Sequence, residues 1–333
     1  MAFRVGVFST KKHDREFLGQ ATSSLTNLDL SYLEVRLTEE TAPLARGFDA
    51  VCLFVHDLAN QAIVETLAAE KIRYIAMRCA GFNNVDLNAC QTHGIKVSRV
   101  PAYSPYAVAE HAVGMILELN RKYFRAHTRI RENNFSLDGL AGFDVHGKTV
   151  GVVGTGKIGE CFSRIMNGFG CEILAYDIQE NPALVELGVA YVELETLLAQ
   201  SDMISLHCPL LPQTHHLINE ATIQQMKPGV MIINTSRGGL ISTPDVIQGI
   251  KSGQIGYLGL DVYEEEEGVF FEDLSDQIVT DDQLMRLNTF PNVLMTSHQA
   301  FFTREALLNI ARTTTENLMC WAEGKSCPNE ISG

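Results

Sequence analysis

Three short segments of this 333-residue sequence carry side chains that can bind an anion and transfer a proton. They are Asn234-Thr-Ser-Arg237-Gly-Gly, Asp261-Val-Tyr-Glu-Glu-Glu266 and Thr296-Ser-His298, and each follows a run of residues typical of a β-strand. In open parallel sheets, ligands bind outside the carboxyl ends of the strands. The spacing therefore places an arginine, an acid and a histidine where they can meet, although each residue alone is more often a surface ion-pair former.

A glycine-rich run predicts a dinucleotide site. The run Thr149-Val-Gly-Val-Val-Gly154-Thr-Gly156-Lys-Ile-Gly159 follows a predicted strand and precedes a helical pattern over 160–168. A G-x-G-x-x-G motif is informative only in this context. Gly154 permits the tight turn, Gly156 lets the backbone approach a pyrophosphate, and Gly159 lets helix and strand pack closely. The pyrophosphate is expected on the N–H groups that begin the helix.

An acid at the end of the next predicted strand indicates which nicotinamide cofactor is used. Asp177 can accept hydrogen bonds from the adenosine ribose hydroxyls, and its charge would repel a 2′-phosphate, which favours NAD over NADP. Hydride transfer to a 2-keto acid also requires a cation for the carboxylate and carbonyl, and an acid that protonates the new alkoxide. Arg237 and His298 match these two requirements.

Strand-like and helical segments alternate along the chain, which predicts an α/β fold of parallel sheets covered by helices on both faces. The expected strands lie at Phe3–Phe8, Ala50–Phe54, Tyr74–Met77, Lys96–Val100, Thr149–Val153, Glu172–Asp177, Met203–His207, Met231–Thr235, Leu258–Val262 and Val293–Thr296. One long helix is expected from Tyr106 to about Asn133, and another over Arg304–Glu323. The length favours two domains. We place a substrate domain at residues 1–102 with 300–333, and an NAD-binding domain at 103–299.

The composition excludes several classes of protein. A formal net charge of −14 disfavours nucleic acids and anionic membranes as partners. The first ten residues lack the pattern of a secretion signal, and no uncharged stretch approaches the ~18 residues that span a bilayer. The eight cysteines include no C-x-x-C pair and mostly lie in apolar segments, which predicts reduced thiols in a cytoplasmic protein. No group of histidines has metal-ligand spacing, so we predict no metal site.

The ordered motifs resemble the D-isomer-specific 2-hydroxyacid dehydrogenases over essentially the whole chain. The matching segments are Gly154–Gly159, Asp177, His207-Cys-Pro209-Leu, 234–239, 261–266, 297–301, 78–86 and 99–105. Within the family the likeness is strongest to the fermentative D-lactate dehydrogenases, including the insertion Gly268–Asp282. The resemblance implies two doubly wound domains, with a Rossmann NAD-binding domain inserted in a flavodoxin-like substrate domain.

By this resemblance, three residues carry the chemistry. Arg237 binds the substrate carboxylate and polarises the keto group, and His298 is the acid–base. Glu266 hydrogen-bonds His298 and stabilises its imidazolium form. In the family this acid lies five residues after the strand-end aspartate, which selects Glu266 from four consecutive glutamates and leaves Glu264 as the alternative.

The resemblance also implies the ligand contacts. Those to NAD come from Gly154, Gly156, Lys157, Ile158, Gly159, Asp177, Cys208, Pro209, Thr214, Thr235, Ser236 and Asp261, the last beside the nicotinamide carboxamide. Those to the substrate come from Arg78, Cys79, Ala80 and Gly81, with Phe54, Tyr103 and Phe301 bordering its side chain.

The three aromatic residues leave a small pocket, so the expected reaction is NADH-dependent reduction of pyruvate to D-lactate. The open alternatives are a glyoxylate/hydroxypyruvate reductase, a branched-chain 2-keto acid reductase, and an NAD-sensing corepressor that binds peptides. The long helix after Pro105 could pack against a second subunit, as in the family, so a homodimer or homotetramer is expected.

Overall fold

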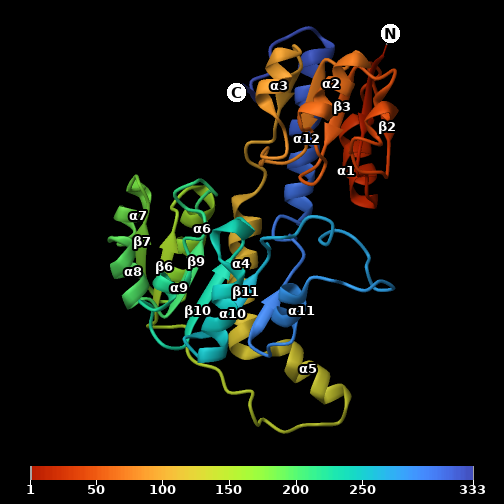
Figure 1. Ribbon diagram of the computed structural model, residues 1–333. Coiled ribbons are helices and arrows are strands. Elements are labelled where there is room, and N and C mark those ends of the chain that lie inside the picture. The colour runs from red at the N-terminus through yellow and green to blue at the C-terminus, as the bar shows by residue number, and fades with distance from the viewer. Residues whose placement is uncertain (1, 333) are drawn as a thin grey trace. The chain divides into compact units, whose positions relative to one another are not determined.

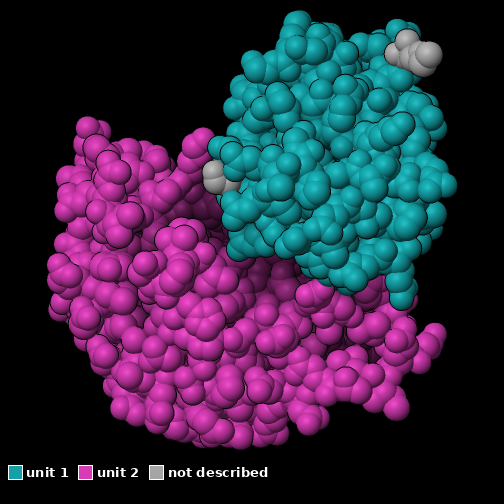
Figure 2. Space-filling model, turned by 45° about the horizontal axis from the view of Figure 1, so that its top comes forward, with its two compact units in different colours: residues 1–104, 302–333 teal, residues 105–301 magenta. Residues whose placement is uncertain are grey.

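The computed structural model describes residues 2–332, and the chain divides into two compact units. Unit 1 comprises residues 1–104 and 302–333, and unit 2 comprises residues 105–301 (Figure 2). Both boundaries lie two residues beyond the expected ones. Asn309 donates a hydrogen bond to the carbonyl oxygen of Tyr103 (2.7 Å), which ties Tyr103 to unit 1. The N–H of Ala300 donates to Asp261 (2.9 Å), which keeps that turn in unit 2.

Unit 1 is a six-stranded sheet in the order β13-β5-β4-β3-β1-β2. Without β13, which runs antiparallel to β5, this is the 2-1-3-4-5 order of flavodoxin-like folds. Its elements are β1 (Phe3–Val7), α1 (Lys12–Thr22), β2 (Leu28–Tyr32), η1 (Ala42–Ala45), β3 (Ala50–Leu53), α2 (Gln61–Ala69), β4 (Tyr74–Met77), α3 (Leu87–Thr92), β5 (Lys96–Ser98), α12 (Arg304–Ala322) and β13 (Glu330–Ile331).

Unit 2 is a seven-stranded parallel sheet in the order β12-β11-β10-β9-β6-β7-β8, which contains the strand order of a Rossmann fold (Figure 1). Its elements are α4 (Pro105–Arg121), α5 (Tyr123–Arg131), β6 (Thr149–Val153), α6 (Lys157–Gly168), β7 (Glu172–Tyr176), α7 (Pro182–Glu186), β8 (Ala190–Tyr191), α8 (Leu194–Gln200), β9 (Met203–Leu206), α9 (Glu220–Ile223), β10 (Val230–Asn234), η2 (Gly238–Leu240), α10 (Thr243–Ser252), β11 (Ile255–Leu260), α11 (Asp282–Asn288) and β12 (Val293–Met295).

The apolar strand runs are explained by burial on both faces of the sheet in unit 2. Along β10, Ile232 packs in a core with residues of α8 and α10, whereas Met231 and Ile233 pack in a second core with residues of α4 and α6. Parallel strands covered by helices on both sides are continuously hydrophobic for this reason. The carboxyl ends of these strands are thereby held in register, and the loops that follow them lie along one edge.

The structure differs from the sequence prediction at several elements. Strands β2, β8 and β13 were not expected; β8 and β13 have only two residues each, too short to leave a pattern. The long helix expected from Tyr106 to Asn133 is broken at Lys122, whose φ of +54° is left-handed. Its Nζ donates to the carbonyl oxygens of Gly139 and Ala141, contacts that sequence periodicity does not reveal. Among residues 2–332, no helix is both long and apolar enough to cross a bilayer.

Candidate active site

The turn between β6 and α6 has the geometry that a pyrophosphate requires. Gly154 has a φ of +94°, and a Cβ atom there would lie 2.5 Å from the backbone nitrogen of Cys208. A Cβ atom on Gly159 would lie 2.0 Å from the carbonyl oxygen of Gly154, whereas the space beside Gly156 is open. Gly156 is the N-cap of α6 and has no capping side chain. The N–H groups of the first turn, which includes Lys157 and Ile158, are therefore available to an anion.

Asp177 lies directly after β7, beside this turn. Its Oδ2 accepts hydrogen bonds from the backbone nitrogen (2.6 Å) and the hydroxyl (3.1 Å) of Thr155. Its Oδ1 accepts a long bond from the backbone nitrogen of Gln179 (3.4 Å), so that oxygen keeps a lone pair for a further donor such as a ribose hydroxyl.

The loop after β9 carries three of the expected cofactor contacts and is held close to the glycine-rich turn. The thiol of Cys208 is buried, and burial raises its pKa to about 11, so it stays neutral. Thr214 donates its hydroxyl to the carbonyl oxygen of Pro209 (2.7 Å) and accepts from the nitrogen of Leu211 (2.8 Å). These bonds shape the loop and use much of the hydrogen-bonding capacity of the Thr214 hydroxyl.

The loop after β10 presents Arg237. The buried Asn234 side chain accepts from the nitrogen of Ser236 (3.0 Å) and donates to the carbonyl oxygen of Arg237 (2.8 Å), while Ser236 donates to the carbonyl oxygen of Cys208 (2.7 Å). A Cβ atom on Gly238 would lie 2.1 Å from the backbone of Tyr263, which explains the glycine that follows the arginine. Arg237 itself donates one bond, to the carbonyl oxygen of Ser236 (2.7 Å). A guanidinium has five N–H donors, so several remain for a carboxylate.

The loops after β11 and β12 bring Glu266 to His298. The Nδ1 atom of His298 lies 3.0 Å from Oε1 of Glu266. Burial raises the pKa of the Glu266 carboxyl, but the hydrogen bond and charge of His298, the N–H of Tyr263 and the charge of Arg237 together lower it below its ordinary value. The carboxylate is therefore ionised, and the structure pairs His298 with Glu266.

Glu264, the alternative partner, points elsewhere. It pairs with Nε2 of His216, and its other oxygen accepts from the backbone nitrogen (3.2 Å) and hydroxyl (3.0 Å) of Thr243 at the start of α10. Two glutamates that are two residues apart thus join different parts of unit 2.

Asp261 organises the turn that carries His298. Its fully buried carboxylate accepts from the hydroxyl of Thr296 (2.5 Å) and from the nitrogens of Gln299 (2.8 Å) and Ala300 (2.9 Å). Its carbonyl oxygen accepts from the nitrogen of His298 (2.7 Å). This network holds His298 in a left-handed conformation, with a φ of +49°.

His111 completes this network. Its Nε2 lies 3.1 Å from the hydroxyl of Thr296 and 3.5 Å from the carboxylate of Asp261. Burial lowers the pKa of His111, whereas the charge of Asp261 raises it. The effect of burial is larger, so the pKa of His111 lies below its ordinary value. The partner Thr296 lies 185 residues further along the chain, so local sequence patterns do not reveal this contact.

One neighbour of His298 was missed altogether. The ring of Phe271 lies 5.8 Å from the ring of His298, and its backbone nitrogen donates to the hydroxyl of Ser297 (3.3 Å). Phe271 belongs to the insertion Gly268–Asp282 and has a φ of +68°, which is unusual for a bulky residue. Its position within an insertion typical of the D-lactate dehydrogenases was the only available signal.

In unit 1, the side chain of Arg78 is buried and bonded to groups of the same unit. It is 2% exposed, donates to Asp14 (2.9 Å) and to the carbonyl oxygen of Ser9 (2.9 Å), and lies over the ring of Phe54 at 5.1 Å. Burial lowers the pKa of this guanidinium, but Asp14 more than compensates, so it stays charged. Arg78 therefore supports Phe54 and the loop that follows β4 from inside the unit.

The other residues expected to contact the substrate belong partly to unit 1 and partly to unit 2. In unit 1, the Cys79 thiol donates to the carbonyl oxygen of Gly81 (3.2 Å), and Arg99 donates to that of Ala80 (3.0 Å), which fixes the loop. Phe54 and Tyr103 are half-buried there. In unit 2, Phe301 follows the turn organised by Asp261 and is 9% exposed.

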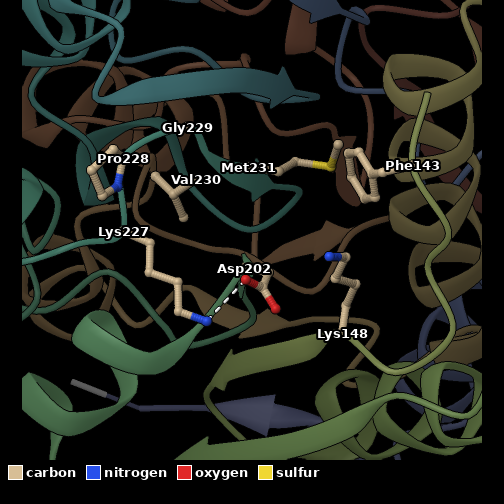
Figure 3. A pocket seen from close by; sticks show the side chains of 8 residues that line it. All are labelled: Phe143, Lys148, Asp202, Lys227, Pro228, Gly229, Val230 and Met231. Carbon is tan, nitrogen blue, oxygen red and sulfur yellow. Dashed lines mark hydrogen bonds and ion pairs between the residues drawn. The ribbon is translucent and has the colours of Figure 1, made fainter. Parts of the chain in front are cut away.

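A cavity of about 220 Å³ lies away from these residues. Its polar lining is Lys148, Asp202 and Lys227, and Figure 3 shows the ion pair between Lys227 and Asp202 (2.9 Å). Lys148 and Asp202 immediately precede β6 and β9, so the cavity lies at the amino ends of the strands. The candidate site lies at the opposite edge.

Comparisons with known proteins agree with this arrangement. Residues 113–300 match the model of the NAD binding domain of the D-isomer specific 2-hydroxyacid dehydrogenases. The chain is 52% identical over 328 residues to the D-lactate dehydrogenase of Escherichia coli, covering 98% of this chain and 99% of that one. The chain belongs to the D-isomer-specific 2-hydroxyacid dehydrogenase family. It is an NAD-dependent enzyme.

Two solved structures extend the comparison. The pyruvate reductase of Chlamydomonas reinhardtii is 46% identical with a TM-score of 0.93, and the match covers 98% of both chains. The D-lactate dehydrogenase of Lactobacillus jensenii with NAD+ is 29% identical with a TM-score of 0.82, covering 99% of this chain and 100% of that one.

The residues of this chain fit NAD. The N-terminus of α6 opens onto free space beside Gly156, and Oδ1 of Asp177 can accept another donor. The hydroxyl of Thr235 is buried and has no hydrogen-bond partner among residues 2–332, as expected of a group that meets a ligand. The chain thus offers an open helix N-terminus to phosphates and a carboxylate oxygen to a ribose hydroxyl.

Proposed function

We propose that this dehydrogenase reduces pyruvate to D-lactate with NADH as the reductant. The observation that carries the proposal is the His298–Glu266 pair, with Nδ1 and Oε1 3.0 Å apart, at the same strand edge as Arg237. A histidine oriented by a carboxylate is suited to general acid–base catalysis. Full-length similarity to the D-lactate dehydrogenase of Escherichia coli supports the substrate.

Each residue has a distinct role in the proposed mechanism. When bound, NADH supplies the hydride that reduces the keto carbon. Arg237 binds the carboxylate of pyruvate through paired N–H groups and polarises the carbonyl. His298 donates the proton through Nε2, because Nδ1 faces Glu266. Glu266 stabilises the imidazolium and fixes the orientation of the ring.

Asp261 is proposed to act in two ways. It positions His298 through the turn at 296–300, and it remains the expected acceptor for the nicotinamide carboxamide. A carboxylate has about four lone-pair sites, and three of those on Asp261 accept from Thr296, Gln299 and Ala300. The fourth site is on Oδ2, within a carboxylate that is fully buried in this structure.

The proposed small substrate rests on three aromatic residues. Phe54, Tyr103 and Phe301 are expected to border the methyl group, and the cation–π contact of Arg78 holds Phe54 in place. Hydrophobic pockets discriminate by only ~1–3 kcal/mol per methylene, so related keto acids are expected to react more slowly rather than not at all.

The test is an NADH-oxidation screen over pyruvate, glyoxylate, hydroxypyruvate and 2-ketoisocaproate, with chiral analysis of every product except the achiral glycolate. We expect the highest kcat/KM for pyruvate and only D-lactate as its product. A higher value for any of the other three acids would replace pyruvate with that acid, and formation of L-lactate would overturn the proposed geometry.

We also propose that the enzyme is a homodimer or homotetramer that associates through α5 and the segment after it. No residue of α5 is buried, and Phe124, Phe135 and Leu137 are 75%, 71% and 81% exposed. Figure 1 shows this segment extending from the body of unit 2. Several large apolar side chains exposed along one segment favour an interface there.

The oligomeric state can be measured by light scattering. Phe124→Glu combined with Leu137→Glu should reduce the mass, whereas Ile278→Glu, a change at another exposed apolar residue (91%), should not. A wild-type monomer would refute association. We further propose a cytoplasmic location, which the eight free thiols support, seven of them buried.

A further inference from the structure

A cluster of metal-binding groups lies in unit 2 outside the proposed active site. It consists of His215, His216 and Glu264, one ligand atom of each lying within 4.8 Å of the others. We propose that these three side chains bind a divalent ion of the zinc class. The site has no part in the reaction proposed above.

The chemistry of the three ligands selects the metal. Two imidazole nitrogens and one carboxylate oxygen suit Zn²⁺ and its neighbours in the transition series, whereas Mg²⁺ and Ca²⁺ prefer oxygen ligands alone. Zinc takes four ligands at about 2.0–2.2 Å, so water would occupy the fourth position. The carboxylate supplies a negative charge on a chain whose formal net charge is −14.

Two of the three ligands already meet. Nε2 of His216 and Oε1 of Glu264 are hydrogen-bonded, and the Glu264 oxygen that remains is fixed by Thr243. A metal ion would bind between these two atoms in place of their hydrogen bond. Thr243 would then support the carboxylate from the second coordination shell.

The third ligand has the freedom to complete the site. The ring of His215 lies against that of His216, with centroids 3.9 Å apart and planes 29° apart, and His215 is exposed. In tetrahedral geometry the ligand atoms are about 3.3 Å apart, so a small rotation of His215 brings its nitrogen into range.

The backbone around the histidines is held firmly. His216 has a φ of +50°, its nitrogen donates to the carbonyl oxygen of Gly239 (2.8 Å), and its carbonyl oxygen accepts from Asn219 (2.8 Å). Ligands on a preorganised loop bind with a smaller loss of entropy. Local sequence patterns do not reveal this site, because His216 and Glu264 are 48 residues apart.

The experiment uses the EDTA-treated full-length enzyme, titrated with Zn²⁺ in a calorimeter and with Co²⁺ in a spectrophotometer. We expect one Zn²⁺ per chain, a Zn²⁺-dependent rise in the melting temperature, and Co²⁺ bands in the visible range without a thiolate charge-transfer band. His215→Phe preserves the stacked ring and removes the nitrogen. His216→Asn keeps a residue that tolerates positive φ.

Each variant should weaken Zn²⁺ binding on the order of a hundredfold, at the upper end of the ~10–100-fold loss seen when a supporting residue is removed. His93→Phe, a change at another exposed histidine, should bind Zn²⁺ as the wild type does. Three results would overturn the proposal: no Zn²⁺ binding by the wild type, equal binding by folded His215→Phe, or a Co²⁺–thiolate band, which would assign the metal to a cysteine.

Discussion

Two arginines follow parallel strands at the carboxyl edges of the two sheets, and they have opposite surroundings. Arg78 directly follows β4 in unit 1 and is 2% exposed, with Asp14 and the Ser9 carbonyl oxygen each 2.9 Å from its guanidinium. Arg237 follows β10 in unit 2, is half-buried, and donates to the carbonyl oxygen of its neighbour Ser236. Residue type and topological place are shared, yet only Arg237 is exposed enough to offer its N–H groups to a ligand.

Two arginines at similar positions in the fold therefore differ in whether a ligand can reach their N–H groups. Burying a charge costs several kcal/mol unless a partner compensates for it, and Asp14 does so for Arg78. Arg78 therefore stabilises the folded unit. The charge of Arg237 is instead close enough to lower the pKa of Glu266. Substitution of Arg78 should therefore lower the free energy of unfolding, whereas substitution of Arg237 should lower kcat/KM.

The largest expected effect is at His298. His298→Gln should reduce both reaction directions by ~10²–10⁴-fold at every pH, because a general acid–base is lost. The melting temperature should change little, since Asp261 bonds the backbone of this residue rather than its ring. Steady-state kinetics in both directions measure this, and near-normal activity would remove His298 from the mechanism.

The arginine pair gives the most direct test of the comparison. Arg237→Gln should lower kcat/KM for pyruvate by ~10²–10³-fold, as when a transition-state donor is removed, with an unchanged free energy of unfolding. Arg78→Met should lower the free energy of unfolding by ~3–5 kcal/mol, because it leaves the Asp14 charge uncompensated. Urea unfolding and kinetics on both variants decide it. If Arg78→Met has the free energy of unfolding of the wild type and Arg237→Gln has a lower one, the roles assigned to the two arginines are wrong.

Asp177 is an intermediate case, with one oxygen bound to Thr155 and the other open to a further donor. Asp177→Ala should weaken NADH binding by roughly ten- to a hundredfold, equivalent to ~1.5–3 kcal/mol, and relieve the repulsion of NADPH. Fluorescence titration with both cofactors measures the change. A wild type that binds NADPH as well as NADH would refute the assignment.

The smallest expected effect is a shift in pH dependence. The lowered pKa of Glu266 means that its carboxylate is charged at neutral pH and that protonation is reached only at acid pH. This carboxylate lies 3.0 Å from Nδ1 of His298, the residue that donates the proton during reduction. Glu266→Gln should therefore move the alkaline limb of pyruvate reduction to lower pH, by about one pH unit for a loss of ~1.4 kcal/mol.

The control for this shift is Glu265→Gln, which removes the same charge from an exposed neighbour. Its pH profile should overlay that of the wild type. Parallel profiles for Glu266→Gln and the wild type would show that the hydrogen bond to His298 does not tune the reaction.

Much of the fold and site could be predicted from local pattern. Continuous apolar runs marked β1, β3 and β4 and most strands of unit 2, because strands covered on both faces must be hydrophobic throughout. The turn at Gly154–Gly159 was predictable because its conformation and its close contacts require glycine. Spacing and family resemblance together selected Glu266, and the structure forms that pair with His298.

Only the tertiary structure decided which charges have partners. Asp14 and Arg78 are 64 residues apart, and His111 and Thr296 are 185 apart, distances over which no periodicity operates. The break at Lys122 depends on carbonyl oxygens of a later loop, and the opposite directions of Glu264 and Glu266 depend on Thr243 and His298. Local sequence determined which polar groups follow each strand. Their hydrogen-bond partners belong to distant segments, which only folding brings within hydrogen-bond distance.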